Sequence, residues 1–185
     1  QRPGFLPEAT VELATAGLAV QELAPLVDAI IGPTSSLNTL GTLGATVDAG
    51  VLSCSPTATA LALDDFPDNG LFFRTIPSDS LEAVAMANVV ESSGGSTAMI
   101  VYIDDAFGRP FAAAAQEAIA AEGTRVALSI GFTPNEDSIA ATVAAVEKVK
   151  PDIIAVIADG TTGPTIINAI DAGTSTRLTF VVNDA

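Results

Sequence analysis

Hydroxyl side chains follow two apolar runs of this sequence at the points where those runs end. Ser35-Ser36 comes after the run 28–32, and Thr57-Ala58-Thr59 comes after the run 51–55. At the start of a helix or turn, such segments combine hydroxyls with free backbone N–H groups, which together bind a carboxylate. Neither segment contains Lys or Arg, so any carboxylate bound here would be held by neutral donors. The alternative interpretation is a plain helix cap for the serines and a turn for the threonines.

The residue inventory removes several classes of catalytic chemistry. The sequence has no His, which excludes Ser-His-Asp and Cys-His nucleophiles and removes the commonest transition-metal ligand. It has no Gly-rich dinucleotide fingerprint, no phosphate loop and no Gly-x-Ser-x-Gly elbow. Catalysis by paired carboxylates stays open, because Asp and Glu total 22, but no spacing singles out a pair. We therefore expect a protein that is not an enzyme and has no cofactor or metal.

The net charge of −15 disfavours nucleic acid and anionic membranes as partners, because both are negatively charged. High solubility is the simplest reason for so much acid. No apolar run reaches the roughly 20 residues that cross a bilayer, and residues 1–24 do not resemble a signal peptide. If the protein is exported, we expect its signal to have been removed ahead of this sequence. Cys54, the single cysteine, leaves the redox compartment open.

Apolar, β-rich runs alternate with helical patterns along the chain. The strand candidates are residues 28–32, 51–55, 71–75, 97–103, 125–132, 152–158 and 178–182. The helix candidates are residues 8–26, 36–49, 81–93, 107–122, 137–150 and 163–172. Most strand candidates are continuously apolar, Ile153–Ile157 most clearly, as is typical of parallel strands with helices on both faces. The pattern predicts an α/β fold: a doubly wound, three-layer αβα architecture with parallel sheets.

A break in the pattern falls at Ile76-Pro77-Ser78-Asp79. Proline disfavours helix at Ile76, and Ser78 or Asp79 can cap the helix that follows. We expect a hinge here between two lobes, residues 1–76 and 77–185; the alternative is an ordinary strand-to-helix turn within one sheet. The irregular stretch 56–70 is expected to be a loop with one short helical turn.

Five segments resemble one known family in their order and intervals, from about Ala9 to the last residue. They are Asp28–Pro33 leading into Thr34-Ser35-Ser36, Gly50–Leu52 leading into Ser55–Thr59, Phe72–Thr75 followed by Pro77-Ser78-Asp79, Tyr102–Gly108, and Val182-Asn183-Asp184. In this register they are similar to the type I periplasmic solute-binding proteins of the branched-chain amino-acid-binding (Leu/Ile/Val-binding) family. The resemblance implies a periplasmic binding protein type I-like fold, with a ligand held in the cleft between two lobes.

The same resemblance implies which residues contact the ligand. Ser36, Ala58 and Thr59 match positions that hold the α-carboxylate and part of the ammonium group. Asp184 matches the acidic residue that pairs with that ammonium, and Phe107 matches an aromatic residue that packs on the ligand, the alternative being a core residue that anchors the next helix. Asp159 departs from the family, in which Tyr or Gly is common there, and this favours a polar or cationic ligand.

The resemblance further implies the partners and the location. The partners are a small-molecule ligand, an amino acid or an analogue, and the membrane permease of an ABC transporter. The location is periplasmic or extracellular, with lipid anchoring at the cell surface as one form. The alternative function is a ligand-sensing domain of the same fold in a receptor or amide-responsive regulator. A carboxylate-only enzyme is the third class.

Compared with the family, the chain resembles an internal segment with part of lobe one and most of lobe two. The family's first strand and helix, and its return to lobe one, have no counterpart here. We therefore expect a homodimer of this fragment through lobe-one surfaces, because a central strand without its neighbour is open to pairing.

Overall fold

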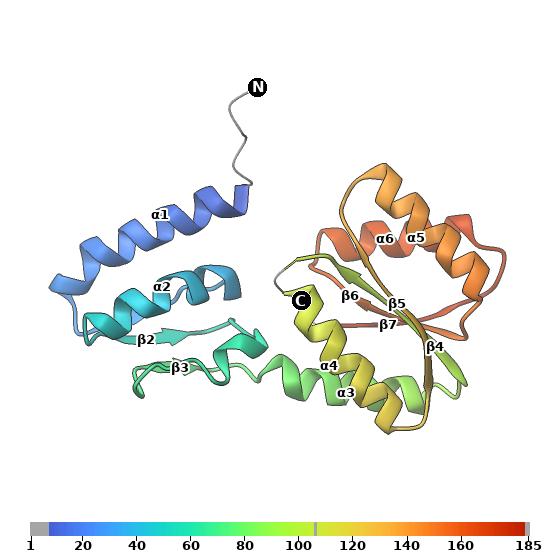
Figure 1. Ribbon diagram of the computed structural model, residues 1–185, viewed down its shortest axis with the longest axis horizontal. Helices are drawn as coiled ribbons and strands as arrows, with labels where there is room; N and C mark the ends of the chain where they lie inside the picture. Colours follow the sequence, from blue (N-terminus) through green and yellow to red (C-terminus); the bar gives the residue numbers. More distant parts are fainter. Residues whose placement is uncertain (1–7, 106, 184–185) are drawn as a thin grey trace. The chain divides into compact units, whose positions relative to one another are not determined.

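The computed structural model describes residues 8–105 and 107–183, with side chains from residue 15 onward. The chain divides into two compact units, Gln1–Ser78 and Asp79–Ala185, drawn in Figure 1.

The first unit contains three short strands and two α-helices among its described residues. In chain order its elements are α1 (Glu8–Leu23), η1 (Ala24–Leu26), β1 (Ala29–Ile31), α2 (Ser36–Asp48), β2 (Leu52–Ser55), η2 (Leu61–Leu63) and β3 (Phe72–Arg74). The strands are parallel, in the order β1-β2-β3. The helix predicted over 8–26 ends as a 3-10 turn because Pro25 cannot continue the α-helical hydrogen bonds. The short helical turn expected in the loop 56–70 is η2.

The core of the first unit reaches the loop that follows β2. Leu43 of α2 packs with Leu63 and Phe72, and with Ala58 and Ala60 of the loop. Ala58 and Ala60 are 0% and 2% exposed, whereas Thr59 between them is partly exposed. The core therefore anchors this loop on both sides of Thr59.

The second unit is a four-stranded parallel sheet with alternating helices. Its elements are α3 (Asp79–Ser92), β4 (Thr97–Ile103), α4 (Gly108–Ala121), β5 (Arg125–Phe132), α5 (Glu136–Val149), β6 (Ile153–Ile157), α6 (Thr162–Gly173) and β7 (Thr179–Val182). The strand order is β5-β4-β6-β7. The predicted position of β4 and β6 at the centre of the sheet is confirmed, and their side chains are almost all buried.

Helices cover both faces of this sheet, as Figure 1 shows. Ile100 and Ala155 face one side and pack with α3 and α4, whereas Met99 and Val156 face the other and pack with α5 and α6. Side chains alternate across a strand, so a continuously apolar run fills both cores at once. The predicted three-layer αβα arrangement with parallel strands is confirmed.

The strand order of the second sheet reverses direction beside β4. The chain runs from β4 to β5 on one side and then returns to β6 on the other side of β4. Loops after β4 and β6 therefore diverge, and ligands of open α/β sheets bind at such a switch point beyond the carboxyl ends of the strands. Phe107 and Asp159 belong to these two loops.

Candidate functional site

In the first unit, hydroxyl groups of β2 and of the loop that follows β2 donate to carbonyls of the loop that follows β1. Three hydroxyls donate to three successive carbonyls: Ser53 to Gly32 at 3.0 Å, Ser55 to Pro33 at 2.6 Å, and Thr57 to Thr34 at 2.6 Å. Parallel pairing of β1 with β2 brings the two strand ends to the same edge of the sheet, where these groups meet.

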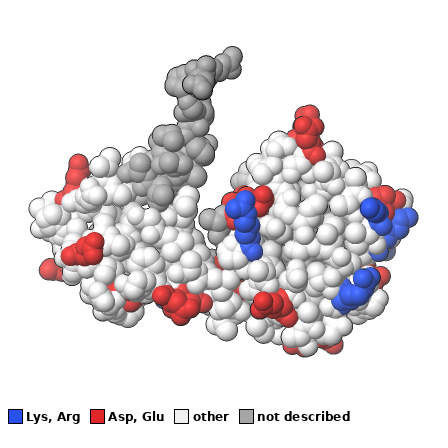
Figure 2. All heavy atoms as spheres, viewed as in Figure 1, with Lys and Arg blue, Asp and Glu red and all other residues white. Residues whose placement is uncertain are grey.

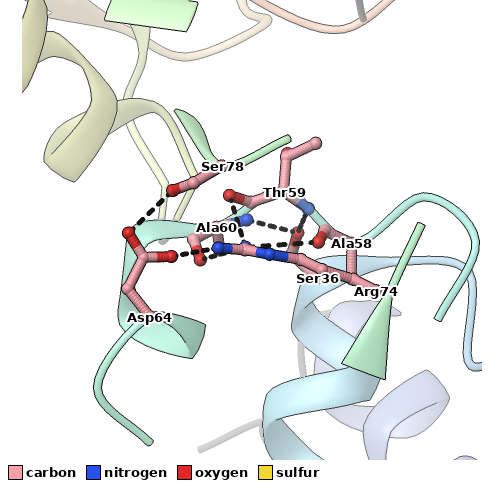
Figure 3. Close-up of polar contacts among 7 residues, drawn as sticks. All are labelled: Ser36, Ala58, Thr59, Ala60, Asp64, Arg74 and Ser78. Carbon is pink, nitrogen blue, oxygen red and sulfur yellow. Dashed lines mark hydrogen bonds and ion pairs between the residues drawn. The ribbon is translucent and has the colours of Figure 1, made fainter. Parts of the chain in front are cut away.

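Ser36 and Thr59, predicted from separate motifs, lie together at this edge. The Ser36 hydroxyl oxygen accepts the N–H groups of Thr59 and Ala60, both at 3.1 Å, as Figure 3 shows. Ser35, not Ser36, caps α2, since its Oγ accepts the Asn38 N–H at 3.1 Å. The plain-cap interpretation therefore applies to Ser35, and Ser36 positions the neighbouring loop.

The expectation of free N–H groups at Ala58 and Thr59 was wrong. The Ala58 N–H donates to the Ser55 hydroxyl oxygen at 3.1 Å, and the Thr59 N–H donates to Ser36. The first turn of an α-helix has backbone N–H groups without intrahelical partners. In α2 these include the N–H groups of Ser36 and Leu37. The Thr59 hydroxyl has no hydrogen-bond partner among the described residues, so it can donate to a bound group.

Arg74, which the predicted site omitted, lies beneath the same loop. From the end of β3 its Nη1 donates to the carbonyls of Thr59, Ala60 and Ala58, at 3.1, 3.3 and 3.5 Å. Its Nη2 forms an ion pair with Asp64. One signal in the sequence could have found it: Arg74 is the only Lys or Arg between residues 8 and 78.

In the second unit, Phe107 stands at the start of α4. Its N–H and that of Gly108 donate to Asp105 Oδ1, at 2.9 and 2.8 Å. The Phe107 ring is partly buried and contacts Phe111 edge-on, with centroids 5.8 Å apart. Phe107 therefore packs on the start of α4, and part of its side chain is exposed.

Asp159 follows β6 and lines a hollow of about 190 Å³ together with Gly160, Gly163, Val182 and Asn183. Its carboxylate is already engaged with the start of α6: Oδ1 accepts two N–H groups and Oδ2 accepts the Thr162 hydroxyl at 2.9 Å. Partial burial raises the pKa of Asp159, but the hydrogen bonds from Thr162 and Thr161 together hold that pKa below its ordinary value.

The remaining predicted residue, Asp184, lies outside the described residues. Within residues 8–105 and 107–183 no group of His, Cys, Asp and Glu side chains is arranged to hold a metal ion. None of the helices in that part of the chain has the length and apolar character that crossing a membrane requires. On the face drawn in Figure 2, Lys and Arg lie over the second unit, whereas Asp and Glu lie over both.

Solved structures of other proteins have a similar fold, and this chain spans about half the length of each of them. An ABC transporter substrate-binding protein from Desulfitobacterium hafniense, in complex with Leu, has a TM-score of 0.75 at 23% identity, covering 95% of this chain and 52% of that one. An extracellular ligand-binding receptor from Rhodopseudomonas palustris HaA2 has a TM-score of 0.83 at 16% identity, covering 92% and 48%. A solute-binding protein from R. palustris, in complex with 4-hydroxybenzoate, has a TM-score of 0.76 at 18% identity, covering 91% and 47%. These low identities show the fold alone.

Sequence comparison adds a curated relative and a family. The chemotactic signal transduction system substrate-binding protein BasB of Halobacterium salinarum is 42% identical over 103 residues, 52% of this chain and 24% of the relative. The model of the periplasmic binding protein family matches residues 14–183. This match covers most of the chain and agrees with the parallel α/β architecture, so the chain belongs to the type I periplasmic binding protein family, of the branched-chain amino-acid-binding type.

Proposed function

We propose that this chain is the solute-recognition part of an extracellular binding protein, which holds an amino acid or a similar small zwitterionic or polar solute. The observation that supports it most is the meeting of Ser36 with Thr59 at the end of the first sheet. This contact joins the loop that carries the Thr59 hydroxyl to the first turn of α2, whose N–H groups and dipole attract a carboxylate.

The units Gln1–Ser78 and Asp79–Ala185 are, in this proposal, a partial lobe one and a nearly complete lobe two. In lobe two we propose Phe107, Asp159 and Asp184 as ligand contacts. Within the described part of the chain, Asp159 Oδ2 accepts one hydrogen bond, from the Thr162 hydroxyl, and a carboxylate oxygen can accept a second. A polar or cationic ligand group would supply it.

We propose that the protein acts outside the cytoplasmic membrane, in the periplasm or on the cell surface, and delivers its solute to the permease of an ABC transporter. The family and the substrate-binding proteins of similar fold support this role. No step of it requires chemical change of the solute, so the protein is not an enzyme in this proposal.

A sensing role is the second candidate. It is favoured by the 42% identity to a chemotactic signal transduction protein, over 103 residues. In that case the bound form would signal to a membrane receptor instead of feeding a permease. Deleting the gene separates the two roles, because a transport protein is needed for uptake of the solute and a sensor for movement toward it.

Calorimetry on the intact protein tests solute recognition. The ligands are leucine, glutamine, arginine and benzoate, which share a carboxylate and differ in ammonium group and side-chain polarity. We expect at least one amino acid to bind, and Thr59→Val to weaken that binding by about 1.5–3 kcal/mol, the usual effect of a hydrogen bond to a charged group.

The control is Thr179→Val, which makes the same change on an exposed residue at the amino end of β7. It should leave the affinity unchanged. If Thr59→Val also binds with unchanged affinity, the Thr59 hydroxyl has no role in recognition. A leucine affinity above that of every polar amino acid would contradict the proposed part of Asp159.

A further inference from the structure

The ion pair of Arg74 and Asp64 lies directly under the loop that presents Thr59. Arg74 donates to all three carbonyls of the loop Ala58–Ala60 through a single nitrogen. Figure 3 shows the guanidinium on one side of this loop and the Thr59 side chain directed away from it. Together with the Ser36 hydroxyl, which accepts the N–H groups of Thr59 and Ala60, Arg74 fixes the orientation of the peptide groups on both sides of Thr59.

The positive charge of Arg74 is enclosed and paired. Its side chain is 16% exposed, and the Asp64 side chain with which it pairs is 30% exposed. The second oxygen of Asp64 accepts the Ser78 hydroxyl at 2.8 Å, which holds the carboxylate in place. Arg74 is the only Lys or Arg between residues 8 and 78. Because Asp64 pairs with it, the one cationic side chain in that range is neutralised.

An unpaired guanidinium at this place would change which ligands bind. It would attract any carboxylate near Thr59 and repel an ammonium group, and these effects act strongly where water is partly excluded. A zwitterion gains from the first effect and loses from the second, whereas a simple carboxylate only gains. The charge state of the pair therefore bears on selectivity between these two ligand classes.

We propose that Arg74 is a positioning residue for the Ala58–Ala60 loop, and that Asp64 is a specificity-determining residue that neutralises Arg74 and so favours zwitterions over simple carboxylates. This inference rests on the proposed solute recognition by the same loop. Neither residue contacts the ligand: Arg74 acts through the loop carbonyls, and Asp64 acts through Arg74.

The test uses the intact protein with two probes, leucine for zwitterions and benzoate for simple carboxylates. Asp64→Asn keeps the shape of the side chain and removes its charge. We expect the affinity for benzoate relative to leucine to rise about threefold to tenfold, the range for a partly exposed charge. Asp48→Asn is the control, because it removes the same charge from the last residue of α2. That residue lies about 18 Å along the helix from Ser36, beyond the screening length of roughly 8 Å at physiological salt.

A second measurement follows the backbone N–H signals of Thr59 and Ala60 by nuclear magnetic resonance without ligand. Arg74→Gln should move both signals, and Arg74→Lys should not restore them, because an ammonium group cannot reproduce the planar fork of the guanidinium. Arg125→Gln, on an exposed residue of β5, should leave them in place.

The outcomes separate the two levels of the proposal. If Asp64→Asn changes the benzoate-to-leucine ratio no more than Asp48→Asn does, the specificity role of Asp64 is overturned. If the Thr59 and Ala60 signals stay in place in Arg74→Gln, the positioning role of Arg74 is overturned. Wild-type protein that binds neither probe would overturn the selectivity assigned to Asp64 between them. Binding of glutamine or arginine would still support solute recognition, and the N–H signals would still support or overturn the role of Arg74.

Discussion

At the scale of single residues, Asp159 shows how a side chain singled out for ligand binding also serves the backbone. Its carboxylate accepts the N–H groups of Thr161 and Thr162 at the start of α6. Such a cap contributes about 0.5–2 kcal/mol to stability. We expect Asp159→Ala to lower the free energy of unfolding by that amount at pH 7, as measured by denaturant unfolding, and Asp159→Asn to lower it less, because Asn keeps an acceptor oxygen.

The pH dependence of this effect follows from the lowered pKa of Asp159, whose ordinary value is 3.8. A carboxyl with a lowered pKa in the folded state stabilises the protein above its unfolded pKa, and loses that contribution as pH falls through the folded pKa. The difference between wild type and Asp159→Ala should therefore be constant above about pH 5 and shrink below 3.8. A difference that grows on acidification would contradict the capping role.

At the scale of elements, Gly108 sets how closely α4 approaches β4. A Cβ at this position would lie 2.0 Å from the Ile103 carbonyl oxygen and 2.9 Å from Ile103 Cγ2. Gly108→Ala must shift the start of α4 and with it Phe107. We expect a loss of about 1–3 kcal/mol in unfolding free energy, measured by denaturant unfolding.

The control for Gly108→Ala is Gly44→Ala, inside α2, where a Cβ would meet nothing within 4 Å. Alanine favours a helix over glycine, so this variant should gain about 0.5–1 kcal/mol. Equal effects of the two substitutions would show that helix propensity, and not the contact with Ile103, decides the result.

At the scale of the whole molecule, the free edge of β1 predicts self-association of this chain. β1 pairs with β2 on one side only among the described residues, and nearby Ile31 and Leu26 are 80% and 78% exposed. An apolar strand edge is a template for another chain. Sedimentation velocity on the 185-residue chain should show a dimer or larger species, which Ile31→Lys converts to monomer. Val84→Lys, on an exposed position of α3, should not do so, and a wild-type monomer would contradict the prediction.

The candidate site was predictable where one motif sufficed and not where distant residues meet. Ser36 and Thr59 could be found because each follows an apolar run, and such ends gather at one edge of a parallel sheet. The engagement of the Ala58 and Thr59 N–H groups could not be foreseen, since their acceptors are hydroxyls of Ser55 and Ser36. A serine can cap, accept or donate with little energetic difference, and its surroundings decide which.

By itself the sequence determined the alternation of strands and helices, the parallel arrangement and the buried centre of the second sheet. These properties follow from apolar periodicity, helix caps and Pro or Gly breaks, which act over a few residues. The tertiary structure alone decided that Ser36 accepts from Thr59, 23 positions away, and that Arg74 and Asp64 join beneath the same loop. The physical reason is that a hydrogen bond depends on positions within a few tenths of an ångström. Strand register and loop path set those positions only after the whole unit has packed.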